Sequence, residues 1–243
     1  MSSPRQIFTY LKNYFDKRNI VKEKNLKALV TAGPTREYID PIRYISNESS
    51  GKQGYEIAIA LNKLGIKTTL ITGPSQLASP KGIKVKKIIS ADEMLNEVKK
   101  TLPVDLAVCT AAVTDFKPAE KNKHKITKEK LNLKSIKFIK NNDILNFLSK
   151  NNRNRPQIVA GFSAETKNVI KNSALKMKNK NCDLIFANDV SKKDIGFNSN
   201  FNKVSMIDQK GNVKLIPKNK KSFIAHKIAQ ILLDKLLDDR NFN

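Results

Sequence analysis

The sequence predicts an α/β fold with a Rossmann-like, doubly wound and mostly parallel sheet, and three observations support this prediction. Apolar runs of strand length alternate along the chain with amphipathic stretches of helical spacing. Polar loops rich in glycine, proline and hydroxyl groups follow the apolar runs. No internal repeat or long low-complexity linker interrupts the 243 residues, so one large domain is expected.

The predicted elements follow one another as βα units. The run Leu26 to Val30 is apolar apart from Lys27, which predicts a largely buried strand, and apolar residues at helical spacing predict a helix at 53–64. Further strands are predicted at 68–72, 106–112, 158–162 and 183–187, and further helices at 91–102, 143–150 and 166–180. A hairpin at 202–216, centred on Gly211, and an amphipathic helix at 222–237 complete the fold.

The loop at 31–54, TAGPTREYIDPIRYISNESSGKQG, is the strongest candidate for a binding site. Its end, Ser49-Ser50-Gly51, comes directly before a predicted helix, where unpaired N–H groups and the helix dipole favour an anion. Ser49, Ser50 and Lys52 would add donors for a phosphate. Plain helix capping by these residues is an equally good interpretation of the pattern. Neither GxGxxG nor GxxxxGK[ST] occurs in the chain.

The formal net charge of +24 raises the possibility of a nucleic-acid-binding protein. The charge comes from 39 lysines and only 7 arginines, and these are scattered among 26 asparagines rather than set in one arginine-rich stripe. Since bidentate recognition of bases favours arginine, we expect no dedicated nucleic-acid partner. The positive field would still attract nucleotides and phosphorylated substrates.

Two further features concern the environment of the protein. No apolar run approaches the roughly 18 residues of a membrane span, and no signal peptide is visible, so we expect a cytoplasmic protein with no membrane partner. Cys109 and Cys182 lie in or beside apolar runs, which predicts buried, reduced thiols rather than a disulfide or a metal site.

The ends of the predicted strands carry the distinctive sequences, as a ligand site in this fold class requires. These are TAGPT at 31–35, CTAAVTD at 109–115, GFSAET at 161–166 and ANDV at 187–190. The end of the second strand, ITGP at 71–74, lacks the acidic residue that would hold a ribose in a dinucleotide site. An NAD(P)-dependent enzyme is therefore disfavoured, although it stays an alternative beside a lysine-rich nucleic-acid-binding module.

Six separated motifs, in this order and spacing, resemble those of the bacterial phosphopantothenate-cysteine ligase family. They are GPTREYIDPIRYISNESSGKQG, AAVTDF, KITK, KNNDI, GFSAET and ANDVS, and the resemblance covers about residues 26–237. The family joins 4'-phosphopantothenate to L-cysteine in coenzyme A biosynthesis, using CTP and a divalent cation, Mg²⁺ or Mn²⁺. Its reaction passes through an acyl-cytidylate intermediate. The resemblance implies the same substrates for this chain.

The resemblance also implies the site residues. Asn47 matches the asparagine that contacts the acyl-phosphate, Lys125 the catalytic lysine of a mobile flap, and Arg43 an arginine of the substrate loop. The nucleotide site would be made by Gly33, Ser50, Gly51, Cys109, Thr110, Ala111, Asp115, Lys125, Asn142, Asp143, Ile144, Leu145, Phe162, Lys176 and Lys180. Asn142 departs from the family, which usually has proline there.

Residues 1–25 are similar to the end of a flavin-dependent decarboxylase domain and its linker, as in the fused bifunctional members of the family. An ordinary N-terminal helix is the alternative. The ligase domain would then occupy 26–238, with a polar tail at 239–243 and no flavin bound by this chain. The family also implies a homodimer.

The residues leave two questions open. Glu37, Asp40, Glu165 and Asp189 are carboxylates near strand ends that could hold magnesium, although the triphosphate could supply most of its ligands. His124 and His226 have no second histidine or cysteine at ligand spacing. The metal ligands and the base that deprotonates the cysteine amine are therefore not predicted.

Overall fold

The computed structural model describes residues 3–127, 136–150, 153–192, 194–196 and 199–238. Its centre is an eight-stranded sheet in the order β12-β11-β10-β9-β6-β1-β4-β5. The strands are β1 (Lys27–Ala32), β4 (Lys67–Thr72), β5 (Lys84–Lys87), β6 (Leu106–Cys109), β9 (Ile158–Glu165), β10 (Leu184–Asp189), β11 (Phe201–Asp208) and β12 (Val213–Lys220). The first six are parallel, and β11 and β12 form an antiparallel hairpin at one edge. The predicted fold class is confirmed.

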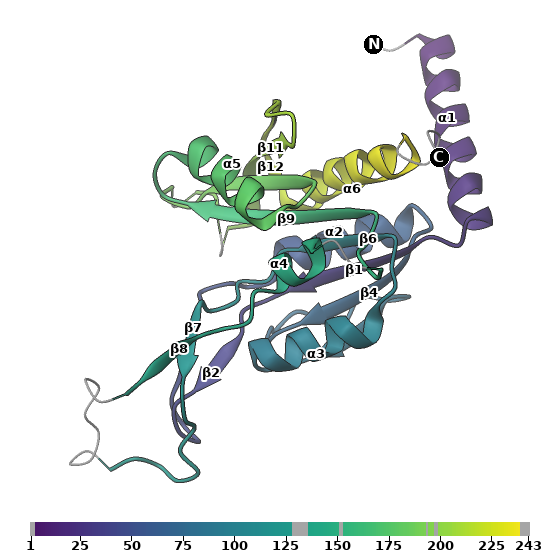
Figure 1. Cartoon of the computed structure of the whole chain (residues 1–243). Helices are drawn as coiled ribbons and strands as arrows, with labels where there is room; N and C mark the ends of the chain where they lie inside the picture. Colours follow the sequence, from purple (N-terminus) through teal and green to yellow (C-terminus); the bar gives the residue numbers. More distant parts are fainter. Residues whose placement is uncertain (1–2, 128–135, 151–152, 193, 197–198, 239–243) are drawn as a thin grey trace.

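Helices cover both faces of the sheet (Figure 1). α2 (Lys52–Lys63) and α6 (Lys221–Asp238) pack with Ala28, Val30 and Ala32 of β1, whereas Leu29 belongs to the core on the opposite face. That second core is built from α3 (Ala91–Thr101), α4 (Ile144–Ser149) and α5 (Val169–Lys180). Because successive side chains of β1 enter different cores, the strand is buried from Ala28 to Ala32, and Ala28, Leu29 and Val30 are apolar as the sequence predicts.

The boundaries of several elements differ from the predicted ones. β6 ends at Cys109 rather than at residue 112, because the chain leaves the ladder there and Pro34 and Ala112 meet only in an isolated bridge. β9 continues to Glu165, so α5 begins at Val169 instead of 166. The strands of the C-terminal hairpin are also longer than predicted.

Five short strands were not predicted. β5 is the polar sequence KVKK at the edge of the sheet, and the other four form two small antiparallel ribbons. β2 (Arg36–Tyr38) pairs with β3 (Tyr44–Ser46), and β7 (Phe116–Pro118) pairs with β8 (Phe138–Lys140). Both ribbons extend from one end of the sheet in Figure 1. The second ribbon carries the predicted flap, of which residues 128–135 lie outside the described part of the chain.

The segment before the sheet is a 20-residue helix, α1 (Pro4–Glu23), which stands apart from the layered domain in Figure 1. Ile7, Phe8, Leu11 and Phe15 are exposed on it, whereas Val21 near its end is fully buried. That this helix links the domain to a decarboxylase stays a prediction, and the tail at 239–243 lies outside the described residues. Among the described residues, no helix is long and apolar enough to cross a membrane.

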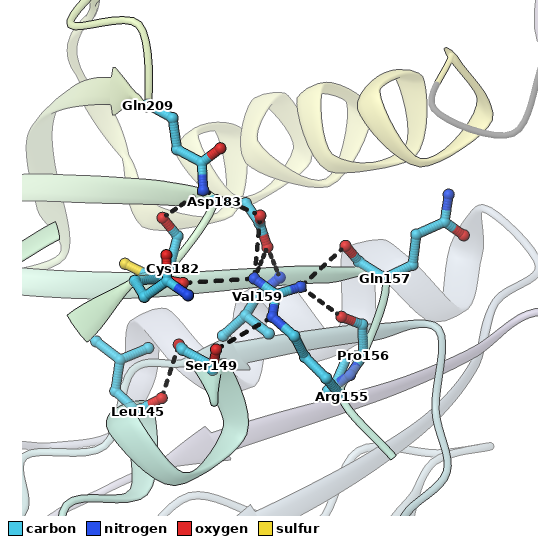
Figure 2. A network of polar contacts seen from close by, with 10 residues as sticks. Leu145, Ser149, Arg155, Pro156, Gln157, Val159, Cys182, Asp183 and Gln209 are labelled. Carbon is cyan, nitrogen blue, oxygen red and sulfur yellow. Dashed lines mark hydrogen bonds and ion pairs between the residues drawn. The ribbon is translucent and has the colours of Figure 1, made fainter. Parts of the chain in front are cut away.

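An ion pair fixes the amino ends of two neighbouring strands (Figure 2). The guanidinium of Arg155, just before β9, contacts both carboxylate oxygens of Asp183, just before β10, at 3.1 and 3.0 Å. Arg155 also donates to the carbonyls of Ser149, Pro156 and Gln157, and Asp183 accepts the Val159 N–H at 2.7 Å. The two side chains are only 18% and 14% exposed. The pair therefore joins α4, β9 and β10 at the end of the sheet where each strand begins.

Replacing Arg155 by alanine is expected to lower the free energy of unfolding by about 2–4 kcal/mol, because it leaves the largely buried Asp183 carboxylate without its ion partner. Urea denaturation measures the loss directly. Arg153→Ala, at an exposed arginine two residues earlier, is the matched control and should change stability by less than about 0.5 kcal/mol. Equal midpoints for the two variants would contradict a structural role for the network.

Candidate active site

Two cavities lie beyond the carboxyl ends of the central strands, where the strand order reverses between β1 and β6. The first, of about 380 Å³, includes the amino end of α2 and is called the α2 cavity. The second, of about 390 Å³, includes the amino end of α4 and is called the α4 cavity. Both are lined by Ala111, Val113, Asp115, Phe162 and Lys176. Because these five residues line both cavities, as a common wall, the two cavities lie side by side.

The amino end of α2 is shaped by two glycines. Gly51 has a φ of 77°, and no side-chain hydrogen bond caps the helix at this position; Gly51 and the first residues of α2 line the α2 cavity. A Cβ atom on Gly54 would lie 2.3 Å from the Thr110 hydroxyl and 2.6 Å from the Ala32 Cβ. Only glycine allows this approach of α2 to β1 and β6.

The serines before α2 form local turns. The Ser49 hydroxyl accepts the Gly51 N–H at 3.3 Å, and the Ser50 hydroxyl accepts the Lys52 N–H at a long 3.5 Å. Both serines and Lys52 line the α2 cavity. The two interpretations of this sequence are therefore compatible, since the serines shape the turn and still face the space where an anion would bind.

Asn47 lies between β3 and α2 and also lines the α2 cavity. Its side-chain N–H donates to the Ala112 carbonyl at 3.0 Å. Ala112 itself donates to the Gly33 carbonyl at 2.9 Å, which ties the loop after β6 to the loop after β1. The amide of Asn47 is thus held at the junction of the two loops, in the lining of the α2 cavity.

Most residues predicted to bind a nucleotide line the α4 cavity. They are Cys109, Ala111, Asp115, Asn142, Asp143, Ile144, Leu145, Phe162, Lys176 and Lys180. Thr110, Ser50 and Gly51 line the α2 cavity instead. Gly33 lines neither cavity, but lies against Gly51, which lines the α2 cavity. Residues from four separate segments therefore gather where the resemblance implies a nucleotide.

The two predicted lysines of α5 both face the α4 cavity. Lys176 donates to the Phe162 carbonyl at 3.1 Å, and Lys180 forms an ion pair with Asp143. Asp143 in turn caps α4 by accepting the Asn146 N–H at 2.8 Å. Asn142, the departure from the family pattern, donates to Asp92 at 2.7 Å and is held by it. The lysines supply positive charge on the side of the cavity formed by α5.

The cysteine beside the α4 cavity has a raised pKa, which disfavours its reactive thiolate form. Cys109 and Cys182 are both free thiols. Burial, together with Cys182 and Asp143, raises the pKa of Cys109 to about 12. Burial and Asp183 raise the pKa of Cys182 to about 11. Cys182 is buried, as predicted, whereas Cys109 is only partly buried, because it lines the α4 cavity.

Arg43 and Lys125 lie outside both cavities. The fully buried Asp40 accepts the N–H groups of Ile42 and Arg43 at 2.9 Å, and that of Ile126 at 3.3 Å. Arg43 pairs with Asp40 at 3.3 Å and donates to the Ile126 carbonyl at 3.3 Å. Burial alone would raise the pKa of Asp40, but these hydrogen bonds and the Arg43 charge hold it below its ordinary value. Arg43 therefore anchors the segment that carries the exposed Lys125.

The carboxylates considered for magnesium have other partners. Glu37 accepts the Ala91 N–H at 2.9 Å, Asp40 holds Arg43, Glu165 accepts the Ser163 hydroxyl at 2.6 Å, and Asp189 accepts the N–H and hydroxyl of Ser191. None of the four lines either cavity. Within the described ranges no three His, Cys, Asp or Glu residues cluster as metal ligands. These residues do not fit a protein-held metal ion.

Several polar residues of the α2 cavity were not predicted as site residues. Besides Gln53 and Ser163, they include Asn188 of β10, Asn202 of β11 and Lys221 at the start of α6. Asn188 belongs to the ANDV motif, which marked its strand end but gave it no chemical role. Lys221 and Asn202 come from the hairpin and the last helix, where no pattern indicates a site. Only the folded chain brings them beside α2.

Comparison with known proteins agrees with this geometry. The family described as the DNA/pantothenate metabolism flavoprotein C-terminal domain, or DFP, matches residues 23–236. The coenzyme A biosynthesis bifunctional protein CoaBC of Haemophilus influenzae is 40% identical over 233 residues, which are 96% of this chain and 57% of that protein. CoaBC of Borreliella burgdorferi is 41% identical over 229 residues, with 93% and 57% covered. The chain thus spans somewhat more than half the length of these relatives.

Solved structures give the same result. The C-terminal domain of CoaBC has a TM-score of 0.72 and 34% identity, with 88% of this chain and 96% of that chain covered. A mutant of Cab2 in complex with phosphopantothenate-cysteine has a TM-score of 0.71, but at 13% identity it shows a common fold only. Since the family matches nearly the whole described domain and the motifs converge on one pair of cavities, this chain belongs to the DNA/pantothenate metabolism flavoprotein C-terminal domain family.

Proposed function

We propose that this chain is a phosphopantothenate-cysteine ligase of coenzyme A biosynthesis. It joins 4'-phosphopantothenate and L-cysteine with CTP and releases CMP and pyrophosphate. The observation that supports this most directly is the pair of cavities with a common wall. A reaction that joins an acid to a nucleotide needs two ligands whose reacting atoms are held in contact. The relationship to CoaBC supplies the chemical class.

In this proposal CTP occupies the α4 cavity and 4'-phosphopantothenate the α2 cavity. The substrate carboxylate attacks the α-phosphate at the common wall, the bond to the β-phosphate breaks, and pyrophosphate leaves. The cysteine amine then attacks the acyl carbonyl of the acyl-cytidylate, and CMP leaves as the new amide forms. Both steps build negative charge on phosphoryl or carbonyl oxygens, which favours neutral donors and cations over carboxylates at the wall.

The residues fit these roles by their chemistry. Asn47 can donate to a phosphoryl or carbonyl oxygen without repelling it. Lys176 and Lys180 can neutralise nucleotide phosphates, and Phe162 offers an apolar ring face. Asp115, which lines both cavities, can accept hydrogen bonds from the nucleotide. Magnesium or manganese would enter as the counter-ion of the triphosphate, since the described residues offer no carboxylate cluster for it.

The family context supports two further proposals about partners. The matched relatives are named bifunctional, so a flavin-dependent decarboxylase would act beside this domain in the native protein. The ligase would also work as a homodimer, which size-exclusion chromatography with light scattering can test. Choice of CTP over ATP rests on the relationship to the bacterial proteins rather than on a single residue.

The decisive measurement is pyrophosphate release with 4'-phosphopantothenate and magnesium, offering CTP or ATP, with and without L-cysteine. We expect release with CTP, and a cysteine-dependent product whose mass is that of 4'-phosphopantothenoylcysteine. Release with ATP alone would overturn the nucleotide assignment. Absence of release with either nucleotide, from protein that is folded by circular dichroism, would overturn the ligase proposal and return attention to an NAD(P)-binding or nucleic-acid-binding role.

A further inference from the structure

The α2 cavity contains a buried lysine that none of the motifs includes. Lys221 is the first residue of α6, is only 3% exposed, and lines the cavity. Its ammonium donates to the Gly196 carbonyl at 2.7 Å. The side chain therefore places a positive charge in the lining of the cavity, where it can attract an anionic ligand.

A second lysine lies beside the first. Lys52, in the first turn of α2, lines the same cavity and donates to the side chain of Asn200. Burial, and then the charge of Lys52, lower the pKa of Lys221 to about 8. Lys52 is close enough for its positive charge to act on Lys221 across the space between the starts of α2 and α6.

Neutral contacts hold these two helix starts together. Gln53 of α2 donates to the Lys221 carbonyl at 3.4 Å and accepts from the Asn202 amide at 3.2 Å. The Lys221 N–H donates to the Asn200 carbonyl at 2.9 Å. Two helix amino ends, each with a positive dipole, therefore meet at the cavity with a lysine from each.

The charged residues that line the α2 cavity are mostly cations. Among the described residues that line it, Asp115 is the only carboxylate, and it belongs to the wall shared with the α4 cavity, which also includes Lys176. Lys52 and Lys221 add two more cations at the starts of α2 and α6. The excess of positive charge among these residues favours an anionic ligand.

A second feature of the α2 cavity also points to a polar ligand. Asn188 is 9% exposed and lines the α2 cavity, and its buried side-chain oxygen has no hydrogen-bond partner within the part of the chain that the structure describes. A buried polar atom without a partner costs about 1–3 kcal/mol, so a polar molecule is expected against it. This observation is independent of the lysines and the helix ends.

We propose that Lys221, assisted by Lys52, binds the phosphate of the acid substrate and makes the ligase select a phosphomonoester over the same acid without phosphate. The inference rests on the proposed function for the identity of the acid. A phosphomonoester dianion between two ammonium groups forms charge-assisted hydrogen bonds with both. With its phosphate there, the substrate would extend along the cavity and place its carboxylate at the common wall. Lys221 is therefore a specificity-determining residue of the α2 cavity.

The test compares 4'-phosphopantothenate with unphosphorylated pantothenate in the pyrophosphate-release assay without cysteine. Lys221→Met keeps the aliphatic stem and removes the charge. We expect kcat/KM for 4'-phosphopantothenate to fall roughly 10- to 100-fold, while kcat/KM for pantothenate stays within about twofold of wild type. Lys220→Met, at the exposed neighbouring lysine, should leave both values unchanged. An equal fall for both acids in Lys221→Met would overturn the proposal.

A binding measurement separates this proposal from the ligase assignment. Inorganic phosphate and 4'-phosphopantothenate should each raise the Tm of the wild type but not of Lys221→Met, whereas CTP should stabilise both proteins equally. If the wild type releases no pyrophosphate, the proposed function fails and the phosphate-dependent Tm still decides the role of Lys221. If Lys221→Met does not fold, Lys52→Met replaces it and should show the same loss in weaker form. Undiminished stabilisation by phosphate in the folded variant would refute the site.

The pH dependence supplies a readout that a merely structural lysine would not change. Lys221 loses its proton as pH rises through about 8, and the charged group that acts on it is Lys52 of α2, while β11 contributes the neutral Asn202. The KM for 4'-phosphopantothenate in the wild type should therefore rise between pH 7 and 9. In Lys221→Met the KM should be higher and flat across this range. A parallel rise in the variant would count against the proposal.

Discussion

Replacing Asn47 by alanine is expected to slow formation of the acyl-cytidylate by about a hundred- to a thousandfold, the usual cost of losing one preorganised donor to a developing oxyanion. The side chain is fixed by its hydrogen bond to Ala112 at the meeting point of the loops after β1 and β6. A donor held in that way needs no reorganisation when charge develops on the phosphoryl oxygen. Its removal should therefore lower kcat much more than it raises KM.

Rapid-quench measurement of the first turnover, without cysteine, isolates this step. CTP affinity should be retained, because Asn47 lines the α2 cavity only. Glu48→Ala is the matched control, since Glu48 is exposed, adjacent and absent from both cavities. Asn47→Asp should be at least as slow as Asn47→Ala, because a carboxylate repels the anion that forms. Wild-type kinetics in Asn47→Ala would reduce Asn47 to a residue of the loop structure.

Lys125→Gln is expected to reduce turnover by about a hundredfold or more while the fold stays intact. Lys125 is exposed and lines neither cavity, so its removal costs no packing. Its ammonium can act on the triphosphate only if the segment carrying it closes over the α4 cavity. The expected signature is therefore a low kcat with unchanged thermal and urea stability.

Lys123→Gln removes the same charge from an exposed lysine two positions earlier and should leave kcat within about twofold of wild type. The contrast between the two variants separates a specific contact from a general loss of positive field. Arg43 holds the segment that carries Lys125, because it donates to the carbonyl of Ile126, the residue directly after Lys125. Normal turnover in Lys125→Gln would remove this lysine from the mechanism.

The elements that the sequence predicted well are those whose residues are buried on both faces or on one continuous stripe. β1 is recognisable because Ala28, Leu29 and Val30 enter cores on alternate faces and all must be apolar. β5 could not be predicted in this way, because the side chains of KVKK are half-buried or exposed at the edge of the sheet and need not be apolar. The ribbons β2-β3 and β7-β8 likewise bury too little surface to leave a periodic pattern.

The residues of the candidate site also divide into those that the sequence predicts and those that it does not. The segments 109–115 and 161–166 could be found from one sequence because the fold class specifies where ligands bind, and the resemblance to a known family then selected Asp115 and Phe162 within them. Lys221 could not be predicted as a site residue. Its burial depends on the packing of α6 beside α2, and this tertiary contact leaves no pattern in the local sequence. The predicted strand ends therefore located both cavities, but they did not reveal that Lys221 lines the α2 cavity.

The wall shared by the two cavities has a thermodynamic consequence. Phe162 and Lys176 line both cavities, so a ligand that shifts either side chain in one cavity also changes the surface that a ligand contacts in the other. The resulting coupling free energy between the two ligands must be reciprocal. If binding of the acid changes the affinity for the nucleotide by some factor, binding of the nucleotide changes the affinity for the acid by the same factor. Substitutions at shared positions should alter that factor, whereas substitutions such as Lys221→Met should change one affinity and leave the factor as it was.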